Sequence, residues 1–473
     1  MKMFTQLYRK WSGLSAFASL WCIAMLLLAS GTAQAVPSFS RQTSMPCATC
    51  HTVFPELTPF GRAFKLNGYQ TDALPQIKGS TPGDEEALLL NQLPPFSFMF
   101  QASYTKTSKA LPDSGVAGAN AQNGQVLIPQ QASIFYAGRL APNLGSFVQI
   151  TYDPEAGAFH LDNTDIRYAT QASVGSNAIT YGATLNNNPT VQDPWNSTPA
   201  WQTPFDQTTS VGPVPNAVTW IDGKAASMGV GGLTAYAWVN SSIYGEVGFY
   251  KSAPQGFGGP LDSTTPGGFI DGTAPYWRLA YENQWDNSAL SVGAYGLNVN
   301  VHPFGAPMGS DTDKYRDVAL DAQYQYITDA HIVSVTSTYI KEDQTLTYSS
   351  SPAVGTAANL DNTLKTFRIG ASYYYQRRYG GALGYFSTTG TADALLYPAG
   401  APTVPYGITG SANGKPDSRG MIAEVDYIPW LNVKYVLQYV AYNKFNGGSS
   451  NYDGLGRNAH DNNTLYMLAW FAF

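Results

Sequence analysis

Residues Pro46 to His51 read PCATCH, which places Cys47 and Cys50 three positions apart and His51 directly after the second cysteine. Cys-x-x-Cys-His is the attachment motif of a c-type haem. Each thiol adds to one vinyl group of the porphyrin, and the adjacent histidine is then held beneath the iron as its proximal ligand. The motif therefore predicts one covalently attached haem c, with Cys47, Cys50 and His51 as its binding residues.

Two other uses of a cysteine pair are weighed against haem. A zinc site requires about four protein ligands, and near the pair only His51 could supply another. A thioredoxin-like dithiol requires a βαβ context, which the flanking sequence does not indicate. A disulfide or redox dithiol and a zinc site are therefore the alternatives to the haem interpretation.

The sixth ligand of the iron is harder to find. Met45 is too close in sequence to Cys47 to reach the opposite face of a haem, and residues 52–94 contain neither Met nor His. Met99 lies directly downstream, on the lumen phase of a predicted strand where a polar side chain would otherwise be expected. We predict Met99 as the distal ligand, which would raise the haem potential. The alternatives are an open position, a purely packing role for Met99, or one of the histidines His160, His302, His331 and His460.

A short helix is predicted immediately after the motif. Thr58 can cap a helix whose first residue is Pro59, and Gly68 can end it. An apolar face is formed by Leu57, Phe60 and Phe64. Since a segment of about 55 residues has too little mass for an independent core, we expect haem to fill it.

Two basic residues of this helix lie away from its apolar face. Arg62 and Lys65 are predicted to meet the haem propionates or solvent, because cationic side chains form strong charge-assisted hydrogen bonds with carboxylates.

The N-terminus predicts export. Basic residues precede an apolar run, and Ala33-Gln34-Ala35 is a well-formed cleavage site, so residues 1–35 are expected to be a signal peptide that includes Cys22. The alternative is an uncleaved membrane anchor, since the apolar run is nearly long enough to span a bilayer. We expect a monohaem cytochrome segment at 36–90 and a porin-like β-barrel at 95–473.

Short alternating segments fill the chain from Pro95 onward. In PFSFMFQASYT, Phe96 and Phe98 share one face while Ser97 and Met99 share the other, as the two-residue period of a strand requires. One face suits lipid and the other a wet lumen. About sixteen strands are expected, beginning near Pro95, Pro129, Ser146, Asn163, Ser176, Gly229, Ser242, Pro275, Ser288, Tyr315, His331, Thr363, Gly381, Gly420, Leu431 and Asn463.

The connections distinguish a membrane barrel from a soluble sandwich. Short turns such as 328–330 alternate with long Gly/Pro/Asn/Ser-rich loops such as 187–224 and 391–418. This sorting, with both chain ends on the periplasmic side and a terminal strand ending at the aromatic Phe473, is typical of outer-membrane barrels. We therefore predict an all-β protein: an antiparallel barrel in the outer membrane of a Gram-negative bacterium, preceded by a short helical cytochrome segment. For the Trp- and Pro-rich stretch 186–205, an outer cap and an inward constriction both remain open.

The composition agrees with a membrane barrel and disfavours nucleic acid as a partner. Charged residues make up 12% of the chain and the net charge is −6, whereas soluble domains average about 25% charged residues. A net negative chain lacks the basic surface that phosphates require. The expected surroundings are outer-membrane lipids.

Val36 to Tyr69, VPSFSRQTSMPCATCHTVFPELTPFGRAFKLNGY, closely resembles the start of the fused outer-membrane cytochrome–porin proteins of iron-oxidising bacteria. Ser40 stands where that family often has Ala. The resemblance implies one c-type haem on a short N-terminal segment joined to a single-chain porin, with Cys47, Cys50 and His51 in attachment and ligation. It also implies an Fe(II) oxidase that acts by electron transfer, without acid/base or nucleophilic residues.

Extracellular Fe(II) and a periplasmic carrier, such as a soluble cytochrome c or a cupredoxin, are thus the expected electron partners. Lumen-phase carboxylates that could meet Fe(II) transiently are Asp165, Asp317, Asp321, Glu424 and Asp426. The alternative for these residues is the ordinary charge lining of a water-filled barrel. For the whole protein, the alternatives are a diffusion porin with a haem-bearing plug, and a haem sensor or peroxidase. A peroxidase would need distal acid–base residues, and the cytochrome segment offers none.

Overall fold

The computed structural model describes residues 37–71, 74–81, 84–111, 123–154, 157–195, 213, 215, 217–224, 229–253, 268–307, 309–400 and 410–473. The predicted signal peptide lies outside these residues. Among the described residues, no helix is long and apolar enough to cross a membrane.

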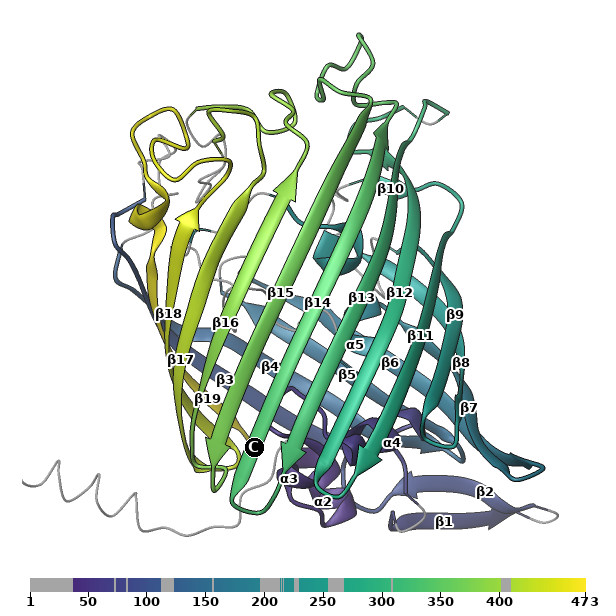
Figure 1. Ribbon diagram of the computed structural model, residues 1–473. Coiled ribbons are helices and arrows are strands. Elements are labelled where there is room, and N and C mark those ends of the chain that lie inside the picture. Colours follow the sequence, from purple (N-terminus) through teal and green to yellow (C-terminus); the bar gives the residue numbers. More distant parts are fainter. Residues whose placement is uncertain are drawn as a thin grey trace, which may run out of the picture. The chain divides into compact units, whose positions relative to one another are not determined.

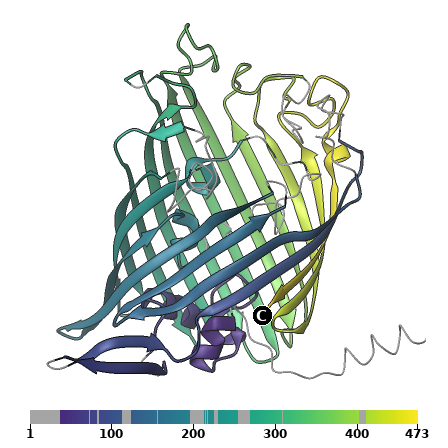
Figure 2. The same cartoon turned by 180° about the vertical axis from the view of Figure 1, so that it is seen from behind.

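The described part of the chain forms one large antiparallel sheet that closes on itself (Figures 1 and 2). Seventeen strands join this sheet, and sixteen make its wall, because β9 pairs directly with β11 while the short β10 pairs with β12. The barrel predicted from sequence is therefore confirmed. The wall strands are β3 (Phe96–Thr107), β4 (Gln125–Ala141), β5 (Leu144–Asp153), β6 (Ala158–Val174), β7 (Asn177–Asn186), β8 (Val230–Val239), β9 (Ile243–Ser252), β11 (Ala274–Trp285), β12 (Ser288–Pro303), β13 (Asp313–Ile327), β14 (His331–Leu346), β15 (Asp361–Tyr375), β16 (Tyr379–Gly390), β17 (Ser418–Trp430), β18 (Val433–Lys444) and β19 (Thr464–Ala472).

The smaller elements lie before and between these strands. In the N-terminal segment they are α2 (Pro37–Thr43), α3 (Cys47–Cys50), α4 (Pro59–Leu66) and a hairpin of β1 (Gln76–Thr81) and β2 (Asp84–Asn91). Elsewhere they are α5 (Pro189–Gln192), η1 (Trp220–Lys224), β10 (Gly268–Ile270) and η2 (Ala459–Asn462). The β1–β2 hairpin was not predicted from the sequence.

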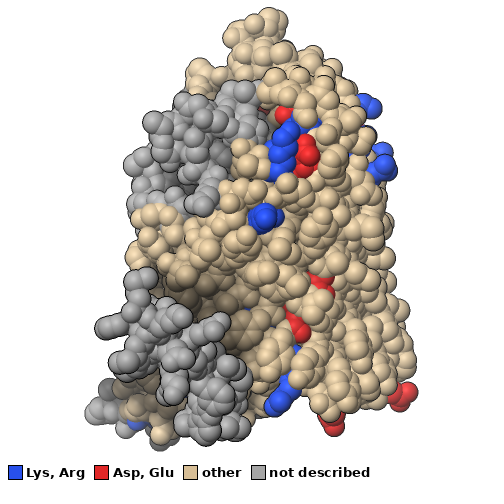
Figure 3. Space-filling view, turned by 90° about the vertical axis from the view of Figure 1, so that its left-hand side faces the viewer, with Lys and Arg blue, Asp and Glu red and all other residues tan. Residues whose placement is uncertain are grey.

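The strand alternation places apolar side chains outside and polar ones inside. On β3, Phe96 and Phe98 are exposed, whereas Ser97 and Met99 are buried within the barrel. Much of the wall in Figure 3 is free of charged side chains. An apolar outer band with a polar interior is what a lipid bilayer requires of a barrel.

Chain connectivity separates the two ends of the barrel. Two- and three-residue turns join alternate strand pairs, for example 142–143 between β4 and β5 and 328–330 between β13 and β14. Most links at the other end are much longer, including 391–417 between β16 and β17. Short turns mark the periplasmic side. Figures 1 and 2 show α2, α3 and α4 at this end, near the C-terminus.

Asp393 fastens two of the long outer loops together. Its carboxylate accepts hydrogen bonds from the backbone N–H groups of Ala358 at 2.8 Å, Asn359 at 3.0 Å and Leu396 at 2.9 Å, and from the Asn362 side chain at 3.1 Å. Burial alone would raise the pKa of Asp393, but these donors hold the pKa below its usual value. The ionised carboxylate therefore stabilises the outer loops.

We expect Asp393→Asn to loosen the loop at 357–360, because the amide cannot accept the same set of hydrogen bonds. The expected local cost is on the order of 2 kcal/mol, measured as faster amide hydrogen exchange at these residues. Asp286→Asn, in an exposed turn at the opposite end, is the matched control. Since the folded-state pKa is lowered, the stabilisation should be full above the ordinary pKa of about 4 and should disappear as pH falls through the lower folded value. Unchanged exchange in the Asp393 variant would contradict this role.

Candidate functional site

The N-terminal segment, the barrel wall and one inward loop enclose a cavity with about 1070 Å³ of empty space, solvent at its mouth included. Its walls come from α2, α3, residues 51–57, α4, the strands β4 to β6, and Val191. Cys47, Cys50 and His51 all line it. The lining is mainly apolar, with a few polar side chains among the aromatic and aliphatic ones, which is typical of small-molecule and cofactor sites.

His51 is held as a neutral imidazole at the cavity wall. Its Nδ1 lies 3.3 Å from the carbonyl oxygen of Pro55, and with the hydrogen placed on Nδ1 this nitrogen donates to Pro55. Burial lowers the pKa of His51 to about 4. A hydrogen bond from one ring nitrogen to a backbone carbonyl fixes the tautomer and orientation of metal-binding histidines. Nε2 then carries the lone pair that could bind iron.

Cys47 and Cys50 are not joined to each other by a disulfide. Burial, and secondarily the neighbouring Cys47, raise the pKa of Cys50 to about 11. Reactive dithiols have lowered rather than raised thiol pKa values, so this environment disfavours dithiol chemistry. Within the described residues there is no group of three or more His, Cys, Asp and Glu placed to hold a metal ion, which disfavours a zinc site.

Aromatic side chains form the opposite side of the cavity. Phe39 stacks on Tyr69 with ring centroids 5.5 Å apart and meets Phe64 edge-on at 5.2 Å. All three rings line the cavity. An apolar aromatic enclosure excludes water and suits a porphyrin face, so the residues present fit a haem attached through the motif.

The helix α4 follows the sequence prediction. Thr58 Oγ1 accepts from the N–H of Gly61 at 3.1 Å, Pro59 is the first helical residue, and Gly68 has the positive φ of +70° that glycine favours. Gly61 is required for close packing: a Cβ there would overlap the carbonyl oxygen of Cys50. Leu57 and Phe64 line the cavity, but Phe60 is exposed, so this part of the predicted apolar face is wrong.

Arg62 does not reach the cavity. It is 1% exposed and forms an ion pair with Glu282 of β11, with Nε 2.8 Å from Oε2. Its Nη1 donates to Gln323 at 3.0 Å and Gln325 at 3.1 Å on β13. The propionate role predicted for Arg62 is therefore not supported by its position, because its guanidinium is committed to the barrel wall.

Lys65 does line the cavity, as predicted. Its ammonium group donates to the backbone oxygen of Val191, and burial lowers its pKa to about 8 despite nearby carboxylates that raise it. Lys65 is thus the basic side chain of α4 that is placed to meet an anionic group in the cavity.

The structure does not bring Met99 to the cavity lining. Its side chain is 2% exposed in a cluster with Phe135 and Trp470, and its sulfur accepts a weak hydrogen bond from Gln101 at 3.7 Å. Phe135 belongs to this cluster and also lines the cavity. Met45, set aside on sequence distance, is the methionine that lines the cavity. The four candidate histidines of the barrel do not line it.

Glu56 joins the N-terminal segment to β13 and β14 of the barrel wall. Its carboxylate accepts hydrogen bonds from Gln323 at 3.1 Å, from Gln325 at 2.8 Å and from the hydroxyl of Ser334. This contact could not be predicted from sequence, because its partners lie more than 260 positions away.

The carboxylates that were expected to meet Fe(II) are engaged in structural contacts instead. Asp165 pairs with Arg167 at 2.9 Å and Asp321 with Arg278 at 3.0 Å. Asp317 accepts a hydrogen bond from the N–H of Ile221, and Glu424 and Asp426 both form ion pairs with Lys434. Four of the five are buried, and Glu424 is half-buried. They therefore contribute structural charge to the barrel lining, which is the alternative to an Fe(II) encounter.

The loop between β7 and β8 folds into the barrel where the structure describes it. This inward segment (residues 187–195 and 217–224) is anchored by Trp195 Nε1, which donates to Glu282 at 2.9 Å, and by the N–H of Trp220, which donates to Glu342 at 2.7 Å. These residues therefore fold inward and constrict the lumen, which was one of the two alternatives for this loop. Trp201 and the rest of the predicted Trp/Pro stretch lie outside the described residues.

No family model and no curated protein matches the chain. Among solved structures, it resembles OmpF of Salmonella typhi in complex with daunomycin at 14% identity and a TM-score of 0.45, over 80% of this chain and 97% of that one. The outer membrane channel DcaP of Acinetobacter baumannii matches at 10% identity and a TM-score of 0.45, over 80% and 96%. An anion-selective porin of Comamonas acidovorans matches at 12% identity and a TM-score of 0.39, over 80% and 98%.

The class of protein follows from the structure itself. A closed wall of sixteen antiparallel strands, an apolar outer band and short turns at one end define an outer-membrane β-barrel with porin architecture. The chain thus belongs in the outer membrane of a Gram-negative bacterium.

We expect Gly61→Ala to disrupt the site, since the new Cβ would collide with the Cys50 backbone and push α4 off the motif. Overpacking of this kind costs about 1–3 kcal/mol. In a host that matures c-type cytochromes, the ratio of haem absorbance to protein should fall. Gly245→Ala on β9, where a new Cβ would make only an ordinary 3.7 Å contact with Leu279, controls for loss of a glycine. Normal haem loading of Gly61→Ala would contradict the packing argument.

Proposed function

We propose that this protein is an outer-membrane electron-transfer protein that carries one c-type haem in the cavity. The observation that supports this best is the meeting of Cys47, Cys50 and His51 on one enclosed cavity, with the imidazole held neutral by burial and oriented by Pro55. The two thiols would hold the group covalently, and His51 would ligate the iron. When bound, haem supplies a one-electron redox centre.

The surrounding side chains would orient that centre and exclude water. Phe39, Phe64 and Tyr69 form an apolar face, and Lys65 places a cation at the wall. Burial and hydrogen bonding around a redox group set its potential. Arg62 and Glu56 fasten the segment to β11, β13 and β14, so that the cavity keeps its position within the barrel.

Extracellular Fe(II) is the proposed donor, on the basis of the sequence resemblance. Each Fe(II) loses one electron and becomes Fe(III) outside the cell, and a periplasmic carrier, such as a soluble cytochrome c or a cupredoxin, accepts that electron. The barrel supports this arrangement because it crosses an insulating membrane. Oxidation on the outer side would also keep insoluble Fe(III) outside the cell.

A second candidate function is a diffusion porin in which the haem segment is a structural plug. The observation that favours it is the porin architecture of the wall. Against it, the inward segment and the buried ion pairs of Arg62, Arg167 and Arg278 occupy the lumen.

Covalent attachment is tested directly. Protein purified from a host with cytochrome c maturation should keep its haem after denaturation, because thioether bonds survive unfolding. Cys47→Ala combined with Cys50→Ala should abolish this, as seen by haem staining of a denaturing gel. The matched control is Cys22→Ala, which lies in the predicted signal peptide and should stain like the wild type. Staining of the double variant would refute the assignment.

The donor is tested in intact cells. Fe(II) added outside should shift the haem absorption bands to the reduced form, and re-oxidation should require a periplasmic carrier. Conductance of the purified barrel in a planar bilayer is measured in parallel. Bands that stay oxidised, in a barrel that passes small solutes freely, would favour the porin with a haem plug.

A further inference from the structure

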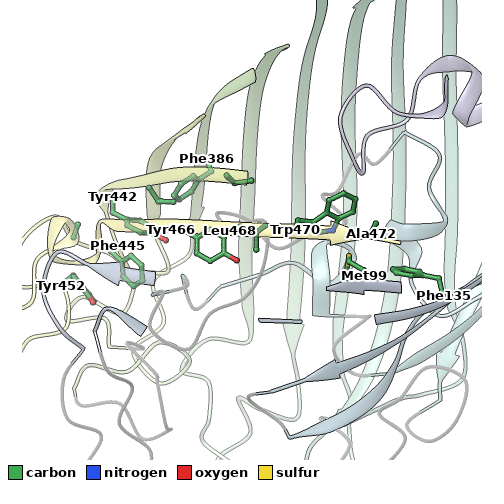
Figure 4. Packing of buried hydrophobic residues seen from close by; sticks show 13 residues of the cluster. Met99, Phe135, Phe386, Tyr442, Phe445, Tyr452, Tyr466, Leu468, Trp470 and Ala472 are labelled. Atoms are coloured by element: carbon green, nitrogen blue, oxygen red, sulfur yellow. The ribbon is translucent and has the colours of Figure 1, made fainter. Parts of the chain in front are cut away.

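Buried aromatic side chains recur along the lumen side of β19 and its neighbours, within one packed cluster (Figure 4). We call these side chains the aromatic row, and its members are Trp470, Tyr466, Phe386, Tyr442, Phe445 and Tyr452. All six are at most 6% exposed and belong to one packed cluster. The row runs from the end of the barrel that carries the cavity to the outer loop that follows β18.

At its inner end, the row touches the cavity. The rings of His51 and Phe54 have centroids 5.2 Å apart, and Phe54 stacks on Trp470 at 5.1 Å. His51 and Phe54 both line the cavity. The proposed iron ligand is therefore connected to the row by two successive ring contacts.

At its outer end, the rings are equally close. Phe386 meets Tyr442 at 5.6 Å, Tyr442 meets Phe445 at 5.0 Å, and Phe445 meets Tyr452 at 5.0 Å. Gly420 makes the first contact possible, because a Cβ there would lie 2.7 Å from Cζ of Phe386. In the middle, Leu468 occupies the lumen phase between Trp470 and Tyr466.

The row departs from the polar lining that is usual inside such a barrel. Two other clusters of buried apolar and aromatic side chains lie mainly on β8 to β14, but the row is the cluster that contains Trp470, the stacking partner of Phe54 in the cavity lining. Packing of the cytochrome segment does not explain the row, because that segment contacts Trp470, whereas Tyr442 to Tyr452 lie at the opposite end.

Aromatic rings differ from aliphatic side chains in their redox chemistry. Trp and Tyr are the most readily oxidised neutral side chains, and electron transfer through protein slows steeply with the gap between redox-active groups. The indole Nε1 of Trp470 is buried and has no hydrogen-bond partner among the described residues. Oxidation of Trp470 therefore need not transfer its proton, which favours rapid return of the electron.

We propose that the aromatic row is the route by which electrons cross the barrel between its outer loops and the cavity. The inference deepens the proposed function and rests on it. One electron that leaves a donor at the outer end arrives at the redox centre beside His51, so the donor is oxidised and the centre reduced by one electron each. The side chains of the row return to their original oxidation state.

The route is tested without Fe(II). Leu455 lies in the outer loop near Tyr452 and is 64% exposed. In the holoprotein it is replaced by cysteine (Leu455→Cys), whose thiol can be labelled because Cys47 and Cys50 are bound to haem. A ruthenium polypyridyl complex is attached there. A flash in the presence of hexaammineruthenium(III), which accepts the excited electron, leaves a ruthenium(III) oxidant at the outer end. This oxidant withdraws one electron from the pre-reduced haem, and the loss of the reduced absorption bands is timed.

We expect Trp470→Phe to slow this oxidation by roughly tenfold or more, and Tyr466→Phe, which removes only a hydroxyl, to slow it in the same direction. Trp238→Phe is the matched control, because Trp238 is equally buried on the lumen side of β8 but lies outside the row. Its rate should equal that of the wild type. The static haem spectrum and reduction potential should be unchanged in all three variants.

A second readout does not depend on haem. In the full chain with Cys47→Ala and Cys50→Ala, the same flash should produce a transient tryptophan radical that disappears with Trp470→Phe and persists with Trp238→Phe. Equal oxidation rates in Trp470→Phe, Tyr466→Phe and the wild type, or a radical that persists without Trp470, would overturn the route. A working route in a protein that Fe(II) fails to reduce would instead refute only the proposed donor.

Discussion

Every backbone N–H and C=O group inside a bilayer must be paired, and the other features of this protein depend on how the chain meets that requirement. The pairing of β19 with β3, from Thr464 opposite Thr107 to Ala472 opposite Met99, closes the sheet. Closure leaves no free edge and fixes which side chains face inward. The same seam carries Trp470, which stacks on Phe54 of the cavity lining, so the closing contact of the barrel also supports the candidate site.

Closing a wall of sixteen strands creates an interior that must be filled or left to water. Here buried charge fills much of the described interior. Arg62 of the cytochrome segment and Trp195 of the inward segment both bind Glu282, so one carboxylate connects three parts of the chain. Removing one partner of a buried ion pair typically costs about 3–5 kcal/mol. These contacts therefore keep the cytochrome segment in one position in the barrel, which an electron-transfer site requires.

A redox centre at the inner end of the barrel would be useful only if electrons could pass the rest of the membrane. The cavity lies at the end with the short turns, and an Fe(II) donor would be on the other side. Charged side chains on the inner wall are engaged in ion pairs with each other, such as the pair of Arg278 and Asp321. The aromatic row is the structure that we propose to connect the two ends, because its packed cluster extends from Trp470 beside the cavity to Tyr452 in the outer loop. The proposed function and the proposed route are therefore linked by geometry but can be tested separately.

Strand alternation and helix capping are local properties of the chain, so the barrel, its strand number, the sorting of its loops and the helix capped by Thr58 could be predicted from the residues alone. The Cys47–His51 motif is equally local, and the haem prediction rests on its spacing. The sequence could not place Arg62, Met99 or Met45 relative to the cavity, nor fold the 187–195 loop inward. Those positions are set by partners hundreds of residues away, such as Glu282, and by the closure that brings them together. Only the tertiary structure decided them, because lumen contacts are made across the barrel and leave no periodic signal along the chain.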